Sequence, residues 1–243
     1  MIFKKTNIAK VLNNVYFKKK TPVSLIHFLT NRCNARCSFC FIDFDNPKTF
    51  AGELSLEEIE KLTKNMGDTL LNVNFTGGEP FARKDIVEIA KTYIDNTTIQ
   101  SIYITTNASV PDRVLNFAKE IHDYNSDIEL NFQISIDDLP ERHNEVRKIK
   151  NLFESCLKTY NDLKALNNDK IKSAVSITVS EENNSNIKSI FNYFVNDCNI
   201  DSIKCCIVRE EGVYKMPLEK KNDMLEAYTL LTNEIRKLKK NNK

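Results

Sequence analysis

Glycine and proline are scarce in this chain, with five and six copies among 243 residues, which argues against long flexible linkers. Long hydrophobic runs are absent as well, and none approaches the roughly 18 apolar residues that a membrane span needs. The first residues, MIFKKTNIAK, lack the apolar core of a signal peptide. We therefore expect a cytoplasmic, reducing location and no transmembrane segment.

A strong charge of one sign is missing too, because the formal net charge of +2 is too close to neutral to indicate a nucleic-acid partner. The N-terminal segment differs, since all its charged residues are lysines, beginning with Lys4 and Lys5. Its apolar residues recur at the spacing of a short amphipathic helix: Ile8, Val11, Leu12 and Val15. We predict that residues 1–21 form a basic amphipathic extension, which either docks against the domain or contacts a membrane surface or an acidic partner.

Six β-rich runs alternate with longer segments of helical character, which predicts an α/β domain with a parallel sheet and crossover helices. The domain should cover residues 22–243 and include a long C-terminal helix. Six such units can form an open sheet or a partial barrel. Ser55 and Glu58 have the spacing of a capping box at the start of the first crossover helix. The predicted strands are Ser24–Thr30, Leu71–Thr76, Ser101–Thr106, Leu130–Asp137, Ala174–Ser180 and Ser202–Val208.

Three of the seven cysteines follow the first predicted strand in the spacing C-x3-C-x2-C: Cys33, Cys37 and Cys40. An odd, clustered set does not fit a disulfide framework, and in a reducing compartment it indicates a metal site. Three thiolates on one short loop can hold three irons of a cubane iron–sulfur cluster. The fourth iron would stay open to a substrate or cofactor, as the open position does in catalytic zinc sites.

Zinc binding and electron transfer remain alternatives on spacing alone. Structural zinc needs four ligands, and the adjacent pair Cys205 and Cys206 would point to opposite faces of a strand. A plant-type ferredoxin has C-x4-C-x2-C spacing and a fourth cysteine, so it differs in one interval. Arg32 precedes the first cysteine and Arg36 the second, and both should lower the cost of ionising the thiols.

The second predicted strand ends in a glycine-rich turn, Gly77-Gly78-Glu79-Pro80. The two glycines permit close approach of the backbone to a ligand, and Glu79 brings a carboxylate to the sheet edge where the cysteines lie. A simple tight turn before a helix is the alternative.

The cysteine spacing, with Phe39 before the last cysteine, and the Gly-Gly-Glu-Pro turn together resemble the radical S-adenosylmethionine (SAM) superfamily. The resemblance implies a partial (β/α)6 barrel of parallel strands with outer helices. It implies that Cys33, Cys37 and Cys40 hold a [4Fe–4S] cluster whose open iron binds the amino and carboxylate groups of SAM. The turn would hold the methionine amino group. Reductive cleavage of SAM would then give methionine and a 5′-deoxyadenosyl radical that abstracts hydrogen from a substrate.

The third predicted strand ends in Thr105-Thr106-Asn107, which would either cap a helix or, as in similar proteins, line the cofactor site at Asn107. Ser135 and Asp137 lie two apart, so they face the same way on a strand. Thr178 in the fifth strand is the candidate to face the adenine.

The segment from Ser135 to Arg147 resembles the Ser-Ile-Asp-Gly and His-Asp-x-x-Arg elements of radical enzymes that modify peptides and proteins. The resemblance assigns Ser135 and Arg147 to the methionine or ribose part of SAM, and a guanidinium can hold a carboxylate through two parallel hydrogen bonds. His143 also matches the motif. Asp138 replaces the usual glycine and Asn144 the usual aspartate.

The function expected from the sequence is thus that of a radical SAM enzyme served by an external electron donor of the flavodoxin or ferredoxin type. The substrate is unidentified, and a peptide or protein is the candidate. No catalytic side chain is assigned, and no pattern for a cysteine-rich domain with further clusters follows residue 206. The alternatives are a scaffold or sensor that binds cluster and SAM without turnover, and a structural zinc protein.

Overall fold

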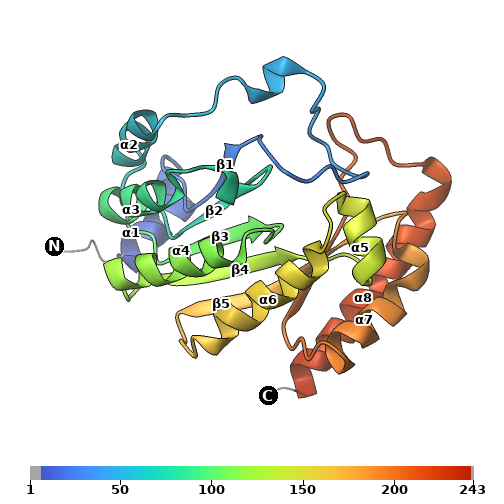
Figure 1. Cartoon of the computed structure of the whole chain (residues 1–243). Helices are drawn as coiled ribbons and strands as arrows, with labels where there is room; N and C mark the ends of the chain where they lie inside the picture. The colour runs from blue at the N-terminus through green and yellow to red at the C-terminus, as the bar shows by residue number, and fades with distance from the viewer. Residues whose placement is uncertain (1–6, 242–243) are drawn as a thin grey trace.

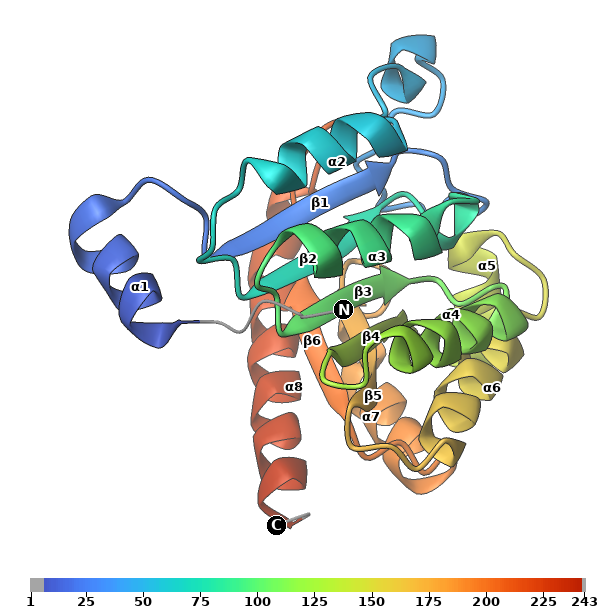
Figure 2. The same cartoon turned by 90° about the vertical axis from the view of Figure 1, so that its left-hand side faces the viewer.

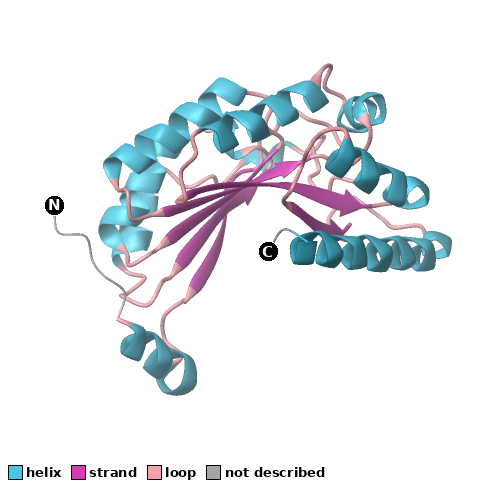
Figure 3. Ribbon diagram, turned by 90° about the horizontal axis from the view of Figure 1, so that it is seen from below, coloured by secondary structure: helices cyan, strands magenta, loops and turns pink. Residues whose placement is uncertain are grey.

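The computed structural model describes residues 7–241. Six parallel strands form one sheet in the order of the sequence, from β1 to β6. The sheet curves like part of a barrel (Figure 3). The barrel does not close, because β1 and β6 lie at opposite edges and do not pair with each other. The predicted partial (β/α)6 barrel is therefore confirmed. The strands are β1 Ser24–Thr30, β2 Asn72–Gly77, β3 Ser101–Thr106, β4 Glu129–Ser135, β5 Ile171–Val179 and β6 Ile203–Ile207.

Helices cover the convex side of the sheet, and the concave side is open (Figures 1 and 3). The α-helices are α1 Ile8–Asn13, α2 Leu56–Lys64, α3 Ile86–Asn96, α4 Pro111–Tyr124, α5 Pro140–Arg147, α6 Leu152–Ala165, α7 Ile187–Asn196 and α8 Lys221–Asn241. Short helices of other types are η1 Asn14–Lys18, η2 Pro47–Phe50, η3 Pro80–Ala82, η4 Asn184–Asn186 and η5 Leu218–Lys220.

Two predicted strand ends were wrong by a few residues, for identifiable reasons. The fourth strand was expected to continue to Asp137, but it stops at Ser135 because the Asp137 N–H donates to the ring of His143. The fifth strand was expected to include Ser180, whose N–H instead donates to the side chain of Asn183. Local side-chain bonds compete with the strand ladder in this way.

Alternate residues of the central strands divide the sheet into a core face and an open face. In β3 and β4, Ile102, Ile104, Phe132 and Ile134 are almost fully buried, while the residues between them are half-buried. Side chains alternate across a strand, so the buried set packs under the outer helices. The intervening positions face the concave side of the sheet. The candidate functional residues lie on this side, at the carboxyl ends of the strands.

The N-terminal extension makes few contacts with the barrel in the part the structure describes (Figure 2). Val11 is buried, and Lys10 forms an ion pair with Asp68. Ile8 and Leu12, which were expected on the apolar face of a helix, are largely exposed. Lys4 and Lys5 lie outside the described residues. Within residues 7–241, no helix combines the length and the apolarity that a membrane span requires.

The predicted capping box yields a stability prediction. The Glu58 N–H donates to Ser55 Oγ at 3.2 Å, and the Ser55 N–H donates to the Glu58 carboxylate at 2.8 Å. Ser55→Ala should lower the free energy of unfolding by about 1 kcal/mol because α2 loses its N-cap. Urea unfolding followed by circular dichroism measures this. Ser185→Ala, at an exposed residue of η4, is the control and should change little; equal losses in the two variants would contradict the cap's contribution.

Candidate functional site

The loop that carries the cysteines leaves β1 and docks on the glycine turn that ends β2. The Gly78 N–H donates to the Thr30 carbonyl at 2.7 Å, and the Glu79 N–H donates to the Arg32 carbonyl at 2.8 Å. A Cβ atom on Gly77 would lie 2.2 Å from the Thr30 oxygen, and one on Gly78 would lie 2.3 Å from the Arg32 oxygen. Gly77 also has a φ of +125°, which L side chains rarely adopt. The glycines are thus required by close approach to the cysteine loop.

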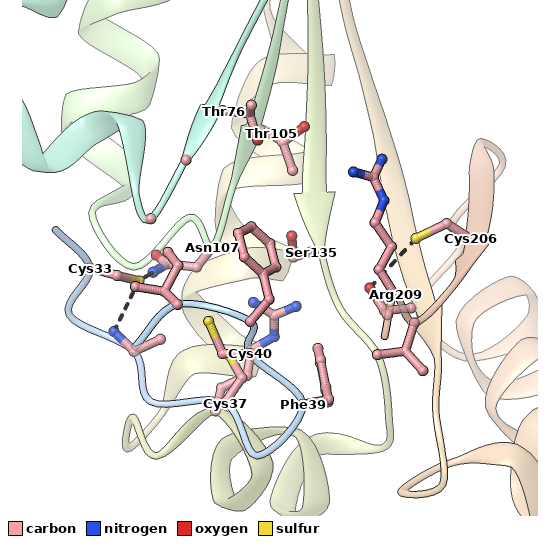
Figure 4. Close-up of a pocket in the computed structure, with 18 of the residues that line it drawn as sticks. Cys33, Cys37, Phe39, Cys40, Thr76, Thr105, Asn107, Ser135, Cys206 and Arg209 are labelled. Atoms are coloured by element: carbon pink, nitrogen blue, oxygen red, sulfur yellow. Dashed lines mark hydrogen bonds between the residues drawn. The ribbon is translucent and has the colours of Figure 1, made fainter. Parts of the chain in front are cut away.

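A cavity of about 250 Å³ that opens to solvent lies between this loop and the carboxyl ends of the strands (Figure 4). Ten of the residues predicted for the site line it: Cys33, Cys37, Phe39, Cys40, Gly77, Gly78, Asn107, Ser135, Arg147 and Thr178. Three predicted residues, Glu79, Pro80 and Asp137, do not line the cavity and lie behind it.

The three cysteines are free thiols held in place by backbone contacts. Cys33 Sγ accepts from the Ala35 N–H at 3.3 Å, and the Cys40 N–H donates to the Cys37 carbonyl at 3.1 Å. Burial raises the pKa of all three thiols, to about 11 for Cys37. Metal binding must therefore displace their protons. The Arg36 guanidinium lies 3.9 Å from the centre of the Phe44 ring and donates to two carbonyls of the loop, so it also holds the loop in shape.

The chemistry of the donor set fits an iron–sulfur cluster. Cys33, Cys37 and Cys40 border one cavity, and Cys thiolates are the protein ligands of such clusters. Within residues 7–241, no three side chains of His, Cys, Asp or Glu are arranged as ligands of a single metal ion.

Glu79 is a buried support of the site. The residue is 2% exposed, and its carboxylate accepts hydrogen bonds from Thr106 Oγ1 and the Asn107 N–H, both at 2.7 Å, and from the Phe81 N–H at 3.1 Å. Burial raises the pKa of this carboxyl, and the three hydrogen bonds oppose the rise. Glu79 thus fixes the end of β3 against the glycine turn, while its backbone holds the cysteine loop.

Asn107 is positioned by this carboxylate and reaches the cysteine loop. Its Nδ2 donates to Asn34 Oδ1 at 2.8 Å and lies 3.8 Å from Cys33 Sγ. Its carbonyl accepts from the buried thiol of Cys156 at 3.1 Å. The alternative expectation of a helix cap was wrong, because α4 begins after Val110 without a side-chain cap.

Arg147 and Asp137 form an ion pair under the cavity. Asp137 Oδ2 accepts from Arg147 Nε at 2.8 Å and lies 2.7 Å from Nη2. The side chain of Asp137 is 3% exposed and that of Arg147 is 9% exposed. Burial alone would lower the pKa of Arg147, but the carboxylate of Asp137 outweighs it and raises that pKa, so the guanidinium stays charged. His143 is buried and neutral, since burial and then Arg147 lower its pKa to about 3, and it has a structural place here.

Several lining residues were not identified from the sequence: Thr76, Thr105, Cys206 and Arg209. The threonines precede recognised strand ends and share their face, so the two-residue period could have identified them. Cys206 is the member of the adjacent cysteine pair that faces the cavity, while Cys205 contacts Thr232 of α8. The sequence predicted that these two cysteines point to opposite faces of the strand, but it did not predict which of them faces the cavity.

A small apolar cluster covers the cysteine loop from the side of the chain that follows β6. It comprises Phe39, Val146, Val208, Tyr214 and Met224, with Cys37 packed against it. Gly212 lies close beneath, since a Cβ there would be 2.1 Å from the Phe41 carbonyl. This cluster packs against the cysteine loop through Cys37 and Phe39.

Comparisons with known proteins agree with this geometry. Residues 28–194 match the Radical SAM superfamily. GTP 3′,8-cyclase of Actinobacillus pleuropneumoniae serotype 5b is 31% identical over 134 residues, which are 54% of this chain and 37% of that protein. The sporulation killing factor maturation protein SkfB of Bacillus subtilis is 28% identical over 171 residues, 70% of this chain and 38% of its own length. The chain thus spans less than two fifths of these relatives.

The fold agrees with that of a solved structure, Streptococcus suis SuiB bound to S-adenosylmethionine. The TM-score is 0.64 with 17% sequence identity, and the match covers 95% of this chain and 51% of SuiB. At this identity the likeness concerns the fold.

The ion pair under the cavity gives a mutational prediction. Asp137→Asn should lower the free energy of unfolding by roughly 3 kcal/mol, because it leaves the buried charge of Arg147 without its partner. Asp138→Asn is a matched control. Burial raises the pKa of Asp138, and its Oδ2 has no partner among the described residues, so removing its charge should cost little at neutral pH. Urea unfolding at pH 7 compares them, and equal losses would contradict this account.

The glycine turn gives a second prediction. Gly78→Ala places a Cβ against the Arg32 carbonyl and should displace the cysteine loop, so that far less iron is incorporated during anaerobic reconstitution. Iron and sulfide analysis per chain measures the effect. Gly52→Ala is the control, because nothing lies within 4 Å of its Cβ position. Iron incorporation by Gly78→Ala at the level of the control would overturn the prediction.

Proposed function

Because the chain belongs to the radical SAM superfamily, we propose that Cys33, Cys37 and Cys40 hold its [4Fe–4S] cluster and that the adjoining cavity binds SAM. The chain is a radical SAM enzyme, with the cluster and SAM as cofactors. The observation that carries the proposal is the single cavity that the cysteine loop shares with Gly77, Gly78, Asn107, Ser135, Arg147 and Thr178. Arg147 ends α5, and the other residues lie at or just after the ends of β2, β3, β4 and β5.

When bound, the cluster supplies one electron that cleaves the C–S bond of SAM to methionine and a 5′-deoxyadenosyl radical. Side chains of this protein bind and orient the cofactor. Arg147 keeps its charge and has Nη1 free of partners among the described residues, so it suits the methionine carboxylate. Backbone groups of Gly77 and Gly78 are the candidates for the amino group. The hydroxyls of Ser135 and Thr178 are neutral partners for the ribose and adenine.

Asp137, Glu79 and Pro80 take indirect roles in this proposal. Asp137 fixes the guanidinium of Arg147, and Glu79 fixes Asn107 and the turn. Pro80 begins η3, where its missing N–H removes no helical hydrogen bond. Phe39 covers the loop beside Arg147, at 6.0 Å from the guanidinium carbon to the ring centre.

The proposed substrate is a peptide or protein. Support comes from the Ser135–Arg147 element, from the name of SkfB as a maturation protein, and from a structure of SuiB bound to its precursor peptide SuiA. The electron would come from an external donor of the flavodoxin or ferredoxin type. We further propose that residues 1–21 are an extension separate from the catalytic domain, which begins at residue 22.

Anaerobic reconstitution tests this function. The chain should gain four irons, a brown colour, and production of 5′-deoxyadenosine from SAM with dithionite, detected by chromatography and mass spectrometry. Cys40→Ala should lose the colour and the product because one cluster ligand is missing. Cys205→Ala, whose thiol faces α8, should keep both.

Other outcomes would refute the proposal in different ways. SAM binding at a full cluster without any cleavage would indicate a scaffold or sensor. Zinc without iron in the purified chain, and no cluster after reconstitution, would indicate a structural zinc protein.

A further inference from the structure

The concave face of the sheet continues from the cofactor cavity toward the other end of the barrel. Thr76, Thr105 and Cys206 line the cavity, and the residues two positions earlier on their strands share the same face. These are Asn74, Tyr103 and Lys204. Strand register places Asn74 beside Tyr103 and Lys204 beside Ser176, so they belong to one continuous surface. The same face also carries apolar side chains on β1, because the exposed Ile26 and Phe28 pair with Asn74 and Thr76.

Lys204 is an unpaired cation on this surface. Its Nζ lies 5.6 Å from the centre of the Tyr103 ring, so it reaches from β6 over the two intervening strands to β3. It makes no hydrogen bond or ion pair with the residues the structure describes. The nearby carboxylate of Glu129 already pairs with Lys172 and accepts from Asn131. Burial, and then the charge of Lys239, lower the pKa of Lys204, which an anion would reverse.

Neutral hydrogen-bonding groups share the concave face with Lys204. Asn74 Oδ1 is buried and has no partner among the described residues, which is costly unless a ligand supplies a donor. Gln133 of β4 lies two residues before Ser135 and so on the same face. Amide side chains of this kind match the N–H and C=O groups of a peptide backbone.

We propose that this surface binds a peptide segment that presents a carboxylate to Lys204 while its backbone contacts Asn74 and Gln133. The inference rests on the proposed function, because it places the substrate beside the SAM cavity. Lys204 is two residues from Cys206, a distance of roughly 7 Å along a strand. The carboxylate of the peptide would therefore lie close to the edge of the SAM cavity.

A nucleoside triphosphate is the competing occupant of this surface. Its several negative charges call for a cluster of cations, such as the arginines and lysines of phosphate sites. Lys172 is paired with Glu129, whose carboxylate would repel a polyanion beside Lys204. Lys239 near Lys204 and Arg209 in the cavity are further cations, so GTP is included as a competitor in the test.

The test uses the chain reconstituted with its cluster and SAM, immobilised under anaerobic conditions. Two pools of N-acetylated random octapeptides are applied, one C-amidated and one with free C-terminal carboxylates, and the retained peptides are sequenced by mass spectrometry. Peptides with Asp or Glu should be enriched roughly tenfold over neutral ones in the amidated pool. Enrichment in the free-acid pool without Asp or Glu would assign the site to a terminal carboxylate. GTP is the competing probe.

Three variants make the result specific. Lys204→Gln should retain peptides without acidic enrichment, Lys204→Arg should keep the enrichment, and Lys119→Gln, an exposed lysine on α4, should behave as the parent chain. Equal thermal melting would show that Lys204→Gln is folded. Enrichment unchanged in Lys204→Gln, no acidic preference in the parent, or displacement of all peptides by GTP would overturn the inference. The proposed function is tested by a different measurement. If it is wrong, no 5′-deoxyadenosine forms, whichever peptides are retained.

Discussion

The buried ion pair of Asp137 and Arg147 joins the parts of the molecule that form the site. Asp137 accepts from the Thr178 N–H at the end of β5, and its own backbone contacts His143 and Asn183. The carbonyl of Arg147 accepts from the Arg36 N–H in the cysteine loop. An ion pair removed from water is stable only when most of its hydrogen-bonding capacity is satisfied. The surrounding elements meet that demand, and in doing so they fix the loop relative to the sheet.

A second constraint acts on the opposite side of the loop. Gly77 and Gly78 allow its backbone to pack directly on the end of β2, and Glu79 links that turn to Asn107 through hydrogen bonds. The cysteine loop is therefore held between a neutral hydrogen-bonded turn and a charged pair. Of these supports, Arg147 alone brings positive charge into the cavity, which suits a carboxylate ligand next to an anionic cluster.

Motif spacing was sufficient to predict the partial barrel of parallel strands and half of the residues that line the cavity, because each motif ends a strand and parallel strands end at one edge. It could not separate residues that touch a ligand from residues behind them. Asp137 follows the last residue of β4 after the strand has turned away, and Glu79 points into the interior. Both depend on backbone direction after the strand ends. Arg209 depends on the path of the chain after β6, where no motif guides prediction.

The concave face is exposed because the barrel is incomplete. A closed barrel of parallel strands fills its interior with apolar side chains, whereas this sheet leaves its inner face exposed to solvent and ligand. Polar residues such as Asn74 and Gln133 are tolerated there because water or a ligand can satisfy them. Lys204 is held over Tyr103 at the cost of partial burial. A ligand that donates to Asn74 Oδ1 and places an anion beside Lys204 would stabilise both groups. The unpaired polar groups that make this face a poor hydrophobic core therefore favour ligand binding.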